Sequence, residues 1–392
     1  MFRPQIQKTE VLLCLATYCT VMVSLVFFSR QEKETYGFED KIKTTKIMKT
    51  ALSVLKKEVD NPNVSIDNDP NKTRLIFDDR ESPMITHISG TPTLKSKQTV
   101  LKPNFSALIV DMFIKADISR GDTIAVGMTG SFPGANIALY SACEAMELVP
   151  IIITSVGASE WGAIDPDYTW LDLERILFEN EIISHKSIAA SLGGWGDMFK
   201  YNPDSLGGLE GKQLAEEAMI RNDIKRIVYK KEDKVEKRDS VYKDNIHDND
   251  LANYSAYVNI GGGVGSIGVK GKSRYGYGIL DKERVLSDTV DNETNTNGIV
   301  QFFAQSDVQL INIQQIDELI KNEDGISLIK YGIHNENPDI TDEGPLFYYL
   351  KFNLLITVLA LLSTMGVVVV IGMNSFREIN KHMNTYETES IL

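Results

Sequence analysis

Two long uncharged stretches lie near the ends of the chain, on either side of a middle in which apolar and polar residues alternate. Residues 11–29 and residues 352–373 contain no Asp, Glu, Lys or Arg. At about 1.5 Å of rise per residue, a helix over either stretch crosses a hydrocarbon core of roughly 30 Å. The pattern predicts one transmembrane helix near each terminus, with an N-terminal tail over 1–10 and a C-terminal tail over 374–392.

A cleaved signal peptide is the alternative for the first stretch. No small-x-small cleavage motif follows it, because Arg30, Gln31 and Glu32 come next. We therefore favour an uncleaved anchor. The alternative for the second stretch is a buried core helix, but Tyr348 and Tyr349 stand just before it, where an interfacial aromatic belt belongs.

Between the two spans the apolar period switches between that of a helix and that of a strand. Residues 123–126 and 149–155 predict buried strands, joined by a glycine-rich turn over 127–136 and a helix over 137–148. This β–loop–α–β order is the unit of a parallel sheet with helices on its faces. The same reading gives further strands over 226–229, 257–260 and 308–313.

The predicted fold class is therefore α/β. We expect a single doubly wound, mainly parallel-sheet domain over 100–330, flanked by the N- and C-terminal transmembrane helices. A juxtamembrane helix and linker occupy 30–99, and a second linker occupies 331–351. The helix includes 38–58, where apolar residues at helical spacing predict an amphipathic surface helix.

The charge distribution limits the partners and the topology. The chain has 41 Lys and Arg against 54 Asp and Glu, a net charge of −13, which argues against nucleic acid as a partner. Both tails are short and carry Lys or Arg, so we expect the termini in the cytoplasm, the α/β domain outside it, and contact with membrane lipid. The one basic segment, 224–243, is mixed in sign, and we interpret it as a solvated hairpin or loop.

Several kinds of chemistry lack a signature. Three cysteines and five histidines exclude a disulfide scaffold and leave no metal site to propose. The chain has no Walker A spacing, no GxSxG and no HExxH. The sequence therefore names no catalytic residue and no cofactor, and whether the chain is an enzyme stays open.

Three segments follow predicted strands and are expected to meet, because ligands of open α/β sheets bind beyond the carboxyl ends of the strands. They are GMTGSFPGAN at 127–136, SVGASEWGA at 155–163, and NIGGG at 259–263. Glycines allow close backbone approach, and a helix start offers N–H groups to an anion. The candidate ligand-binding residues are Gly127, Thr129, Gly130, Ser131, Gly134, Asn136, Ser155, Ser159, Trp161, Asp172, Gly261, Gly262 and Gly263.

Structural interpretations compete with this one. The first group of glycines could serve only the turn between strand and helix. Thr169 and Asp172 fit a helix capping box, which we favour over catalysis for that carboxylate. Ser131 or Ser159 could be a nucleophile only with a base, such as Asp165 or Asp172, that the sequence does not identify.

The block GMTGSFPGANIALYSACEAMEL followed by SVGASEWGAIDPDYTWLDLE resembles the bacterial poly-γ-glutamate system protein family. The later VNIGGGVGSIG and VQLINIQQI are similar to further segments of that family, and the resemblance covers roughly 100–330. It implies an accessory protein of poly-γ-glutamate synthesis or export, with the other membrane proteins of that machinery as partners. It carries over no catalytic residue. The alternative function is an enzyme, a hydrolase or transferase acting on poly-γ-glutamate or a glutamate-like precursor.

Overall fold

The computed structural model divides the chain into two compact units. One unit is Thr35–Phe347, and the other combines Met1–Glu34 with Tyr348–Leu392. The residues that the structure describes are 9–61, 64–65, 67–87, 94–194, 197–199, 208–228, 233–268, 275–287, 297–320 and 344–389.

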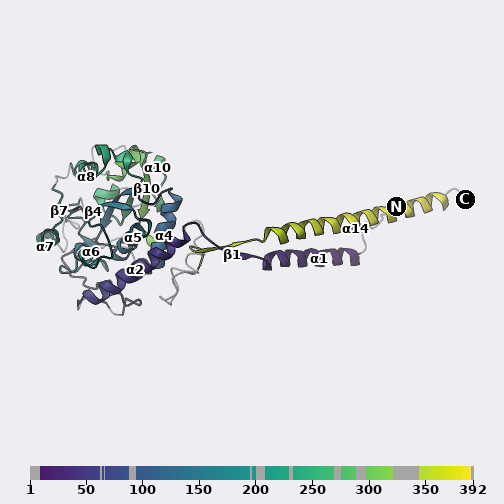
Figure 1. The fold of residues 1–392 in the computed structure, drawn as a ribbon, viewed down its shortest axis with the longest axis horizontal. Coiled ribbons are helices and arrows are strands. Elements are labelled where there is room, and N and C mark those ends of the chain that lie inside the picture. The colour runs from purple at the N-terminus through teal and green to yellow at the C-terminus, as the bar shows by residue number, and fades with distance from the viewer. Residues whose placement is uncertain are drawn as a thin grey trace. The chain divides into compact units, whose positions relative to one another are not determined.

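The terminal unit contains two helices and a short ribbon (Figure 1). Helix α1 (Thr9–Phe28) leads into strand β1 (Gln31–Glu34), and strand β11 (Tyr348–Lys351) leads into helix α14 (Leu354–Glu389). Strands β1 and β11 pair antiparallel, so the two helices run in opposite directions beside each other. Among the described residues, these are the two helices long and apolar enough to cross a membrane.

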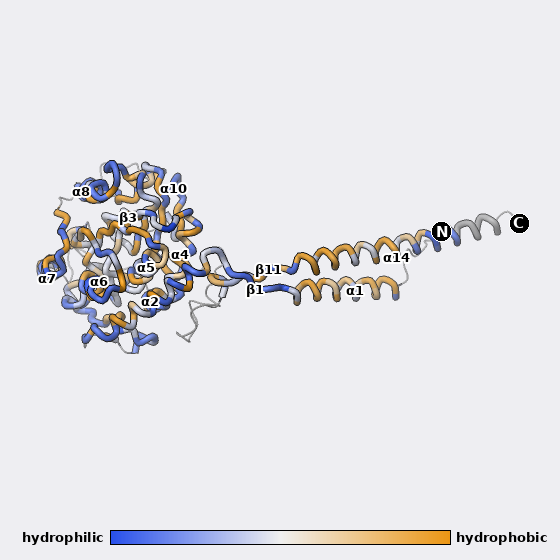
Figure 2. The backbone as a smooth tube through the Cα atoms, viewed as in Figure 1, coloured by the Kyte–Doolittle hydropathy of each residue, from blue (hydrophilic) through white to orange (hydrophobic). Residues whose placement is uncertain are grey.

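The residues of both helices are also apolar enough for a membrane-spanning segment. Figure 2 shows mostly hydrophobic residues along the length of α1 and of the first part of α14. The hydroxyls of Tyr18 and Ser363 form a hydrogen bond between the two helices. The guanidinium of Arg30 lies 3.8 Å from the ring centre of Phe27 and 4.4 Å from that of Phe352. This cation–π pairing places a charge and two rings where α1 ends and α14 begins.

The larger unit is built on a seven-stranded, mainly parallel sheet with helices around it (Figure 1), which confirms the predicted α/β class. The strand order is β7-β6-β4-β3-β8-β10-β9, and only β9 is antiparallel to its neighbour. Successive strands run outward from β3 to β7, and the chain then returns to the other side of β3 for β8 and β10. The strands are β3 (Thr123–Thr129), β4 (Val149–Ser155), β6 (Ala189–Ser191), β7 (Lys225–Arg226), β8 (Ala256–Ile260), β9 (Gly278–Ile279) and β10 (Gln309–Ile313).

The remaining elements surround this sheet. Two short strands, β2 (Ile85–His87) and β5 (Ala158–Ser159), form a separate parallel pair. The helices of the unit are α2 (Phe38–Glu58), α3 (Leu94–Val100), α4 (Asn104–Lys115), α5 (Pro133–Met146), α6 (Trp170–Glu179), α7 (Gly208–Arg221), α8 (Lys234–Lys243), η1 (His247–Asn249), η2 (Leu251–Asn253), α10 (Lys282–Ser287), α11 (Val300–Gln305) and α12 (Ile316–Leu319).

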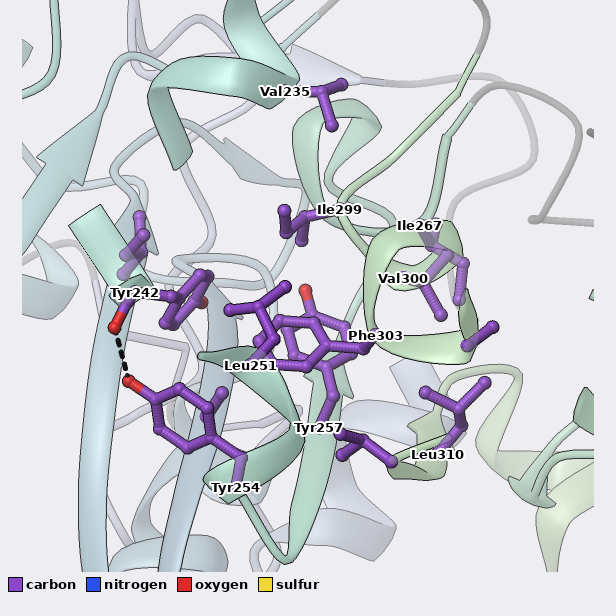
Figure 3. Close-up of a cluster of buried hydrophobic side chains, with 14 of the residues drawn as sticks. Val235, Tyr242, Leu251, Tyr254, Tyr257, Ile267, Ile299, Val300, Phe303 and Leu310 are labelled. Atoms are coloured by element: carbon purple, nitrogen blue, oxygen red, sulfur yellow. Dashed lines mark hydrogen bonds between the residues drawn. The ribbon is translucent and has the colours of Figure 1, made fainter. Parts of the chain in front are cut away.

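One face of the sheet carries an aromatic core, shown in Figure 3. Tyr257 of β8 stacks on Phe303 of α11 with ring centres 4.5 Å apart, and Tyr242 of α8 meets Phe303 edge-on at 5.3 Å. The hydroxyl of Tyr254 donates to the backbone oxygen of Tyr242 at 2.8 Å. Buried aromatic pairs of this kind add about 0.5–1.5 kcal/mol beyond the area they bury. The cluster fixes α8 and α11 to the sheet.

Two local expectations change. Strand β3 continues through Gly127 and Met128 to Thr129, because these residues pair with β4, so the expected turn over 127–136 shrinks to 130–132 before α5 begins. The segment 224–243 was expected to be a solvated hairpin or loop, and this was wrong for its second half. Helix α8 occupies Lys234–Lys243 and buries Arg238, whose charge has a buried partner.

The compact unit is also larger than the α/β domain expected over 100–330. Helix α2, which the sequence predicts as an amphipathic juxtamembrane helix, packs against α4 and α5 and buries Met48, Ala51 and Leu55. The predicted linker over 331–351 lies mostly outside the described residues, because the structure resumes at 344.

Gly134 tests the packing of α5 against α3. A methyl group there would lie 2.7 Å from the carbonyl oxygen of Val100 and 2.9 Å from the amide nitrogen of Leu101. Because backbone atoms cannot move aside cheaply, Gly134→Ala should lower the free energy of unfolding by about 1–3 kcal/mol. Denaturant unfolding of the detergent-solubilised chain measures this. Gly208→Ala is the control, since no atom of the described residues lies within 4 Å of a methyl group at that position. Equal stabilities of the two variants would contradict the packing.

Candidate functional site

A row of polar side chains crosses the sheet at its carboxyl edge. Five neighbouring strands each carry a buried polar residue at their last or next-to-last position. In the strand register Thr129 pairs with Ser155, Ser155 pairs with Ser191, and Asn259 pairs with Asn312. Burying hydroxyl and amide groups costs free energy unless they are hydrogen-bonded. We call this set the polar row: Thr129, Ser155, Ser191, Asn259 and Asn312.

The glycine loop after β8 packs directly on the polar row. A side chain at Gly261 would collide with the Thr129 hydroxyl, and one at Gly263 would lie 3.6 Å from the Ser155 hydroxyl. Gly261 also has φ +85°, a backbone conformation that glycine adopts without strain. The three predicted segments therefore do meet, with 261–263 against the ends of β3 and β4.

An ion pair fixes one half of the polar row. Arg238 and Asp197 are each 1% exposed, and their charged atoms lie 2.7 Å apart. The same Arg238 nitrogen donates to the hydroxyls of Ser191 at 2.5 Å and Ser155 at 3.2 Å. Asp197 also accepts from the Ser191 hydroxyl and the Gly193 amide, each at 2.8 Å. Breaking such a buried pair typically costs about 3–5 kcal/mol, so this network holds the ends of β4 and β6 rigidly.

Amide side chains fix the other half. Asn259 donates to the side-chain oxygen of Asn312 at 2.7 Å and to the backbone oxygen of Gly261 at 2.8 Å. Its own oxygen accepts from the Ser266 hydroxyl at 2.5 Å. The hydroxyl of Thr129 is different, because it is buried and has no hydrogen-bond partner among the described residues.

A buried lysine that the sequence did not single out completes the region. Lys97 of α3 is 1% exposed, and its amine donates to the Ser131 carbonyl and, at 2.9 Å, to the Ser159 hydroxyl. It also lies 4.3 Å from the ring centre of Phe132. Burial lowers the pKa of Lys97 to about 7, an effect that the charge of Glu160 partly opposes.

The candidate residues differ in how far solvent reaches them. Ser131, Trp161, Gly262 and Gly263 are partly exposed. The others are buried by the protein itself: Gly127, Thr129, Gly130, Gly134, Asn136, Ser155, Ser159, Asp172 and Gly261. The glycines at 127, 130 and 134 each bring other chain segments into close contact, so the turn also has the structural role that was the alternative.

Asp172 is occupied by structure. Its carboxylate accepts from the amide and hydroxyl of Thr169, which confirms the capping box of α6. It also accepts from Arg221 at 2.6 Å and from Asn222 at 2.8 Å, which ties α6 to α7. These contacts account for the burial of Asp172 without a ligand.

Two functional candidates were missed for different reasons. Nothing in the sequence distinguishes Lys97 from Lys95 or Lys102, and only the fold buries it. Arg238 did carry a signal, because Val235, Arg238 and Tyr242 repeat at helical spacing and all three are buried. Within the described part of the chain, no group of three or more His, Cys, Asp or Glu side chains is placed to hold a metal ion.

Comparison with known proteins does not identify a family for this chain. No family model, no curated protein and no solved structure matches this chain.

The unpartnered hydroxyl gives a direct test of whether the carboxyl edge is kept for a ligand. Thr129→Val removes a buried hydroxyl that has no partner in the described structure, so the free energy of unfolding should rise by about 1 kcal/mol. Thr154→Val is the matched control in the next strand, because its hydroxyl bonds to that of Ser187 at 2.8 Å, and it should destabilise. Thermal unfolding measures both, and a destabilised Thr129→Val would show that its hydroxyl is already satisfied.

Proposed function

We propose that this chain is a membrane-anchored accessory protein of poly-γ-glutamate synthesis or export. Its α/β domain binds a small anionic ligand or a polymer end at the carboxyl edge of the sheet. The main support for a site at this position is the polar row, because five strands place buried polar groups at this one edge. The resemblance over roughly 100–330 supports the pathway, with the other membrane proteins of the machinery as partners.

The chain path supports a ligand site at this position. We infer a doubly wound sheet, since the aromatic core packs on one face and the chain reverses its direction of strand addition between β3 and β8. In such sheets ligands bind at the carboxyl ends of the strands, beside the loops that follow the two strands at the point of reversal. Here those loops are 130–132 and 261–263, which hold the partly exposed Ser131, Gly262 and Gly263.

The local charge favours an anion although the whole chain is acidic. Burial lowers the pKa of Lys97 to about 7, so part of the population carries an ammonium there at physiological pH. Its amine donates to the Ser131 carbonyl, and among the described residues no carboxylate lies within ion-pair distance of it. Helix α5 also begins two residues after Ser131, and its amino end adds positive potential. At physiological ionic strength the distant acidic surface is screened beyond about 8 Å. Nearby hydrogen-bond donors and positive charge, and not the net charge of the chain, therefore favour a negatively charged ligand.

A charge reversal at Ser131 tests the anion site. Ser131→Glu should weaken binding of a short γ-linked glutamate oligomer by at least about 10-fold, because it places a carboxylate beside the ligand. Isothermal titration with the detergent-solubilised chain measures this. Ser119→Glu is the matched control, since it adds the same charge on an exposed residue four positions before β3 begins. Equal binding by the two variants would remove the site from this edge.

The antiparallel helices α1 and α14 lead to a two-span topology. We propose that both cross the cell membrane, with the termini on the cytoplasmic side and the α/β domain outside. The short tails carry the basic residues that favour the cytoplasmic side.

Cysteine labelling tests this topology. The native cysteines are Cys14 and Cys19 in α1 and the buried Cys143. In intact cells a membrane-impermeant maleimide should label Glu236→Cys, which is exposed on the domain. Glu378→Cys, exposed on the far part of α14, should react only after permeabilisation. The reverse pattern would place the domain in the cytoplasm. The protein without these substitutions is the control for labelling of Cys14 and Cys19.

An enzyme is the second candidate function, as a hydrolase or transferase acting on poly-γ-glutamate or a glutamate-like precursor. The carboxylates considered as bases are engaged elsewhere, since Asp172 caps α6 and Asp165 accepts from Asn61 and from the Asp167 amide. The observation that favours this candidate is the contact between the Ser159 hydroxyl and a buried amine.

A further inference from the structure

A serine and a lysine from distant parts of the chain lie in hydrogen-bond contact beneath the Ser131 loop. The Nζ of Lys97 in α3 is 2.9 Å from the Oγ of Ser159 in β5. Ser159 is 2% exposed and Lys97 is 1% exposed. A nucleophile and a base within about 3.2 Å is the arrangement that activates a hydroxyl.

The surroundings of this lysine are unusual for a structural ion. Its amine contacts the Ser131 carbonyl, the Ser159 hydroxyl and the Phe132 ring. The described residues provide no ion pair for it, whereas the equally buried Arg238 has Asp197 at 2.7 Å. Burying an ammonium without a counter-ion is costly, and a lysine responds by releasing its proton.

We propose that Ser159 is a nucleophile for acyl transfer and that Lys97 is its general base. This deepens the enzymatic candidate and rests on it for the substrate class, which is an amide or ester of an acidic acyl group. Anion binding at the carboxyl edge can hold without it.

The steps balance with water as the only co-reactant. The neutral Lys97 amine keeps one N–H on the Ser131 carbonyl and accepts the Ser159 hydroxyl proton. The Ser159 Oγ then bonds to the substrate carbonyl carbon, and the carbon–nitrogen or carbon–oxygen bond breaks. The Lys97 ammonium gives its proton to the departing amine or alcohol. Water, deprotonated by the same amine, then bonds to the acyl carbon. The bond from that carbon to the Ser159 Oγ breaks, the acid leaves, and the Lys97 ammonium returns its proton to the Ser159 oxygen.

The pKa and the location of the pair agree with this role. A pKa of Lys97 near 7 leaves much of the amine neutral at physiological pH. Ser131, whose carbonyl contacts the Lys97 amine, is partly exposed, and so are Glu160 and Trp161, which follow Ser159 in the chain. The amide of Ser159 donates to the Ser131 hydroxyl at 3.1 Å, which holds the two loops together.

The other buried serines nearby have different partners. The Ser191 hydroxyl donates to the Asp197 carboxylate, but that carboxylate is in a buried ion pair with Arg238. Ser155 and Ser191 contact Arg238, whose guanidinium keeps its proton at any physiological pH. Among these hydroxyls Ser159 is therefore the one with an activating partner.

Labelling with a fluorophosphonate probe tests the pair in the full-length chain in detergent, with peptide mass spectrometry to locate the adduct. Wild-type protein should be labelled at Ser159, and Ser159→Ala should lose the adduct. The labelling rate should rise with pH through about 7, because the neutral amine is the reactive form. Absence of a Ser159 adduct in wild type, or a rate that does not change with pH, would overturn the proposal.

Two substitutions at Lys97 separate its charge from its basicity. Lys97→Arg introduces a cation that cannot accept the proton, so labelling should fall by about 100-fold. Lys97→Met should lose labelling to the same extent. Ser106→Ala is the control, because Ser106 is a buried serine whose hydroxyl donates to the Pro103 carbonyl. Wild-type labelling rates in either Lys97 variant would overturn the proposal, and thermal unfolding checks that each variant folds.

Discussion

Burial of polar side chains at one edge of an otherwise apolar sheet is the constraint on which the rest of the domain depends. Within the strands, residues such as Val126, Ile152 and Val258 are fully buried and apolar. At the carboxyl edge hydroxyls and amides replace them, and each such group costs about 1–3 kcal/mol if it is left without a partner. Four of the five groups in the polar row have hydrogen-bond partners, and the hydroxyl of Thr129 has none among the described residues.

Much of the surrounding structure satisfies the polar row. Helix α8 brings Arg238 across to Ser155 and Ser191, and Asp197 is its counter-ion. A side chain at Gly265 would collide with this ion pair, since a methyl group there would lie 2.7 Å from the Asp197 carboxylate. The glycine loop, α8 and the ends of β4 and β6 therefore form one interdependent assembly.

The sequence predicts those features of the fold that depend on residues close together in the chain. The apolar runs of β4, β8 and β10 identify those strands, and the Thr169–Asp172 spacing identifies the start of α6, because both signals are local. Gly127 was taken for a turn, yet it lies in β3 where Tyr257 and Ser266 come close.

Lysine and arginine usually lie on the protein surface, and Lys97 and Arg238 are buried because segments distant in the sequence pack around them. The short β2 and β5 strands depend on the same kind of contact. The pathway and the ligand stay predictions, because they rest on a resemblance and on chemistry that the fold alone does not test.

Hydrogen exchange of the full-length chain, measured by mass spectrometry with and without a short γ-linked glutamate oligomer, tests the central claim most directly. We expect the oligomer to slow exchange in the segments 130–132, 156–161 and 261–266, which follow β3, β4 and β8 at the carboxyl edge. Unchanged exchange in these loops, or protection confined to other parts of the domain, would contradict the claim that this edge holds the ligand.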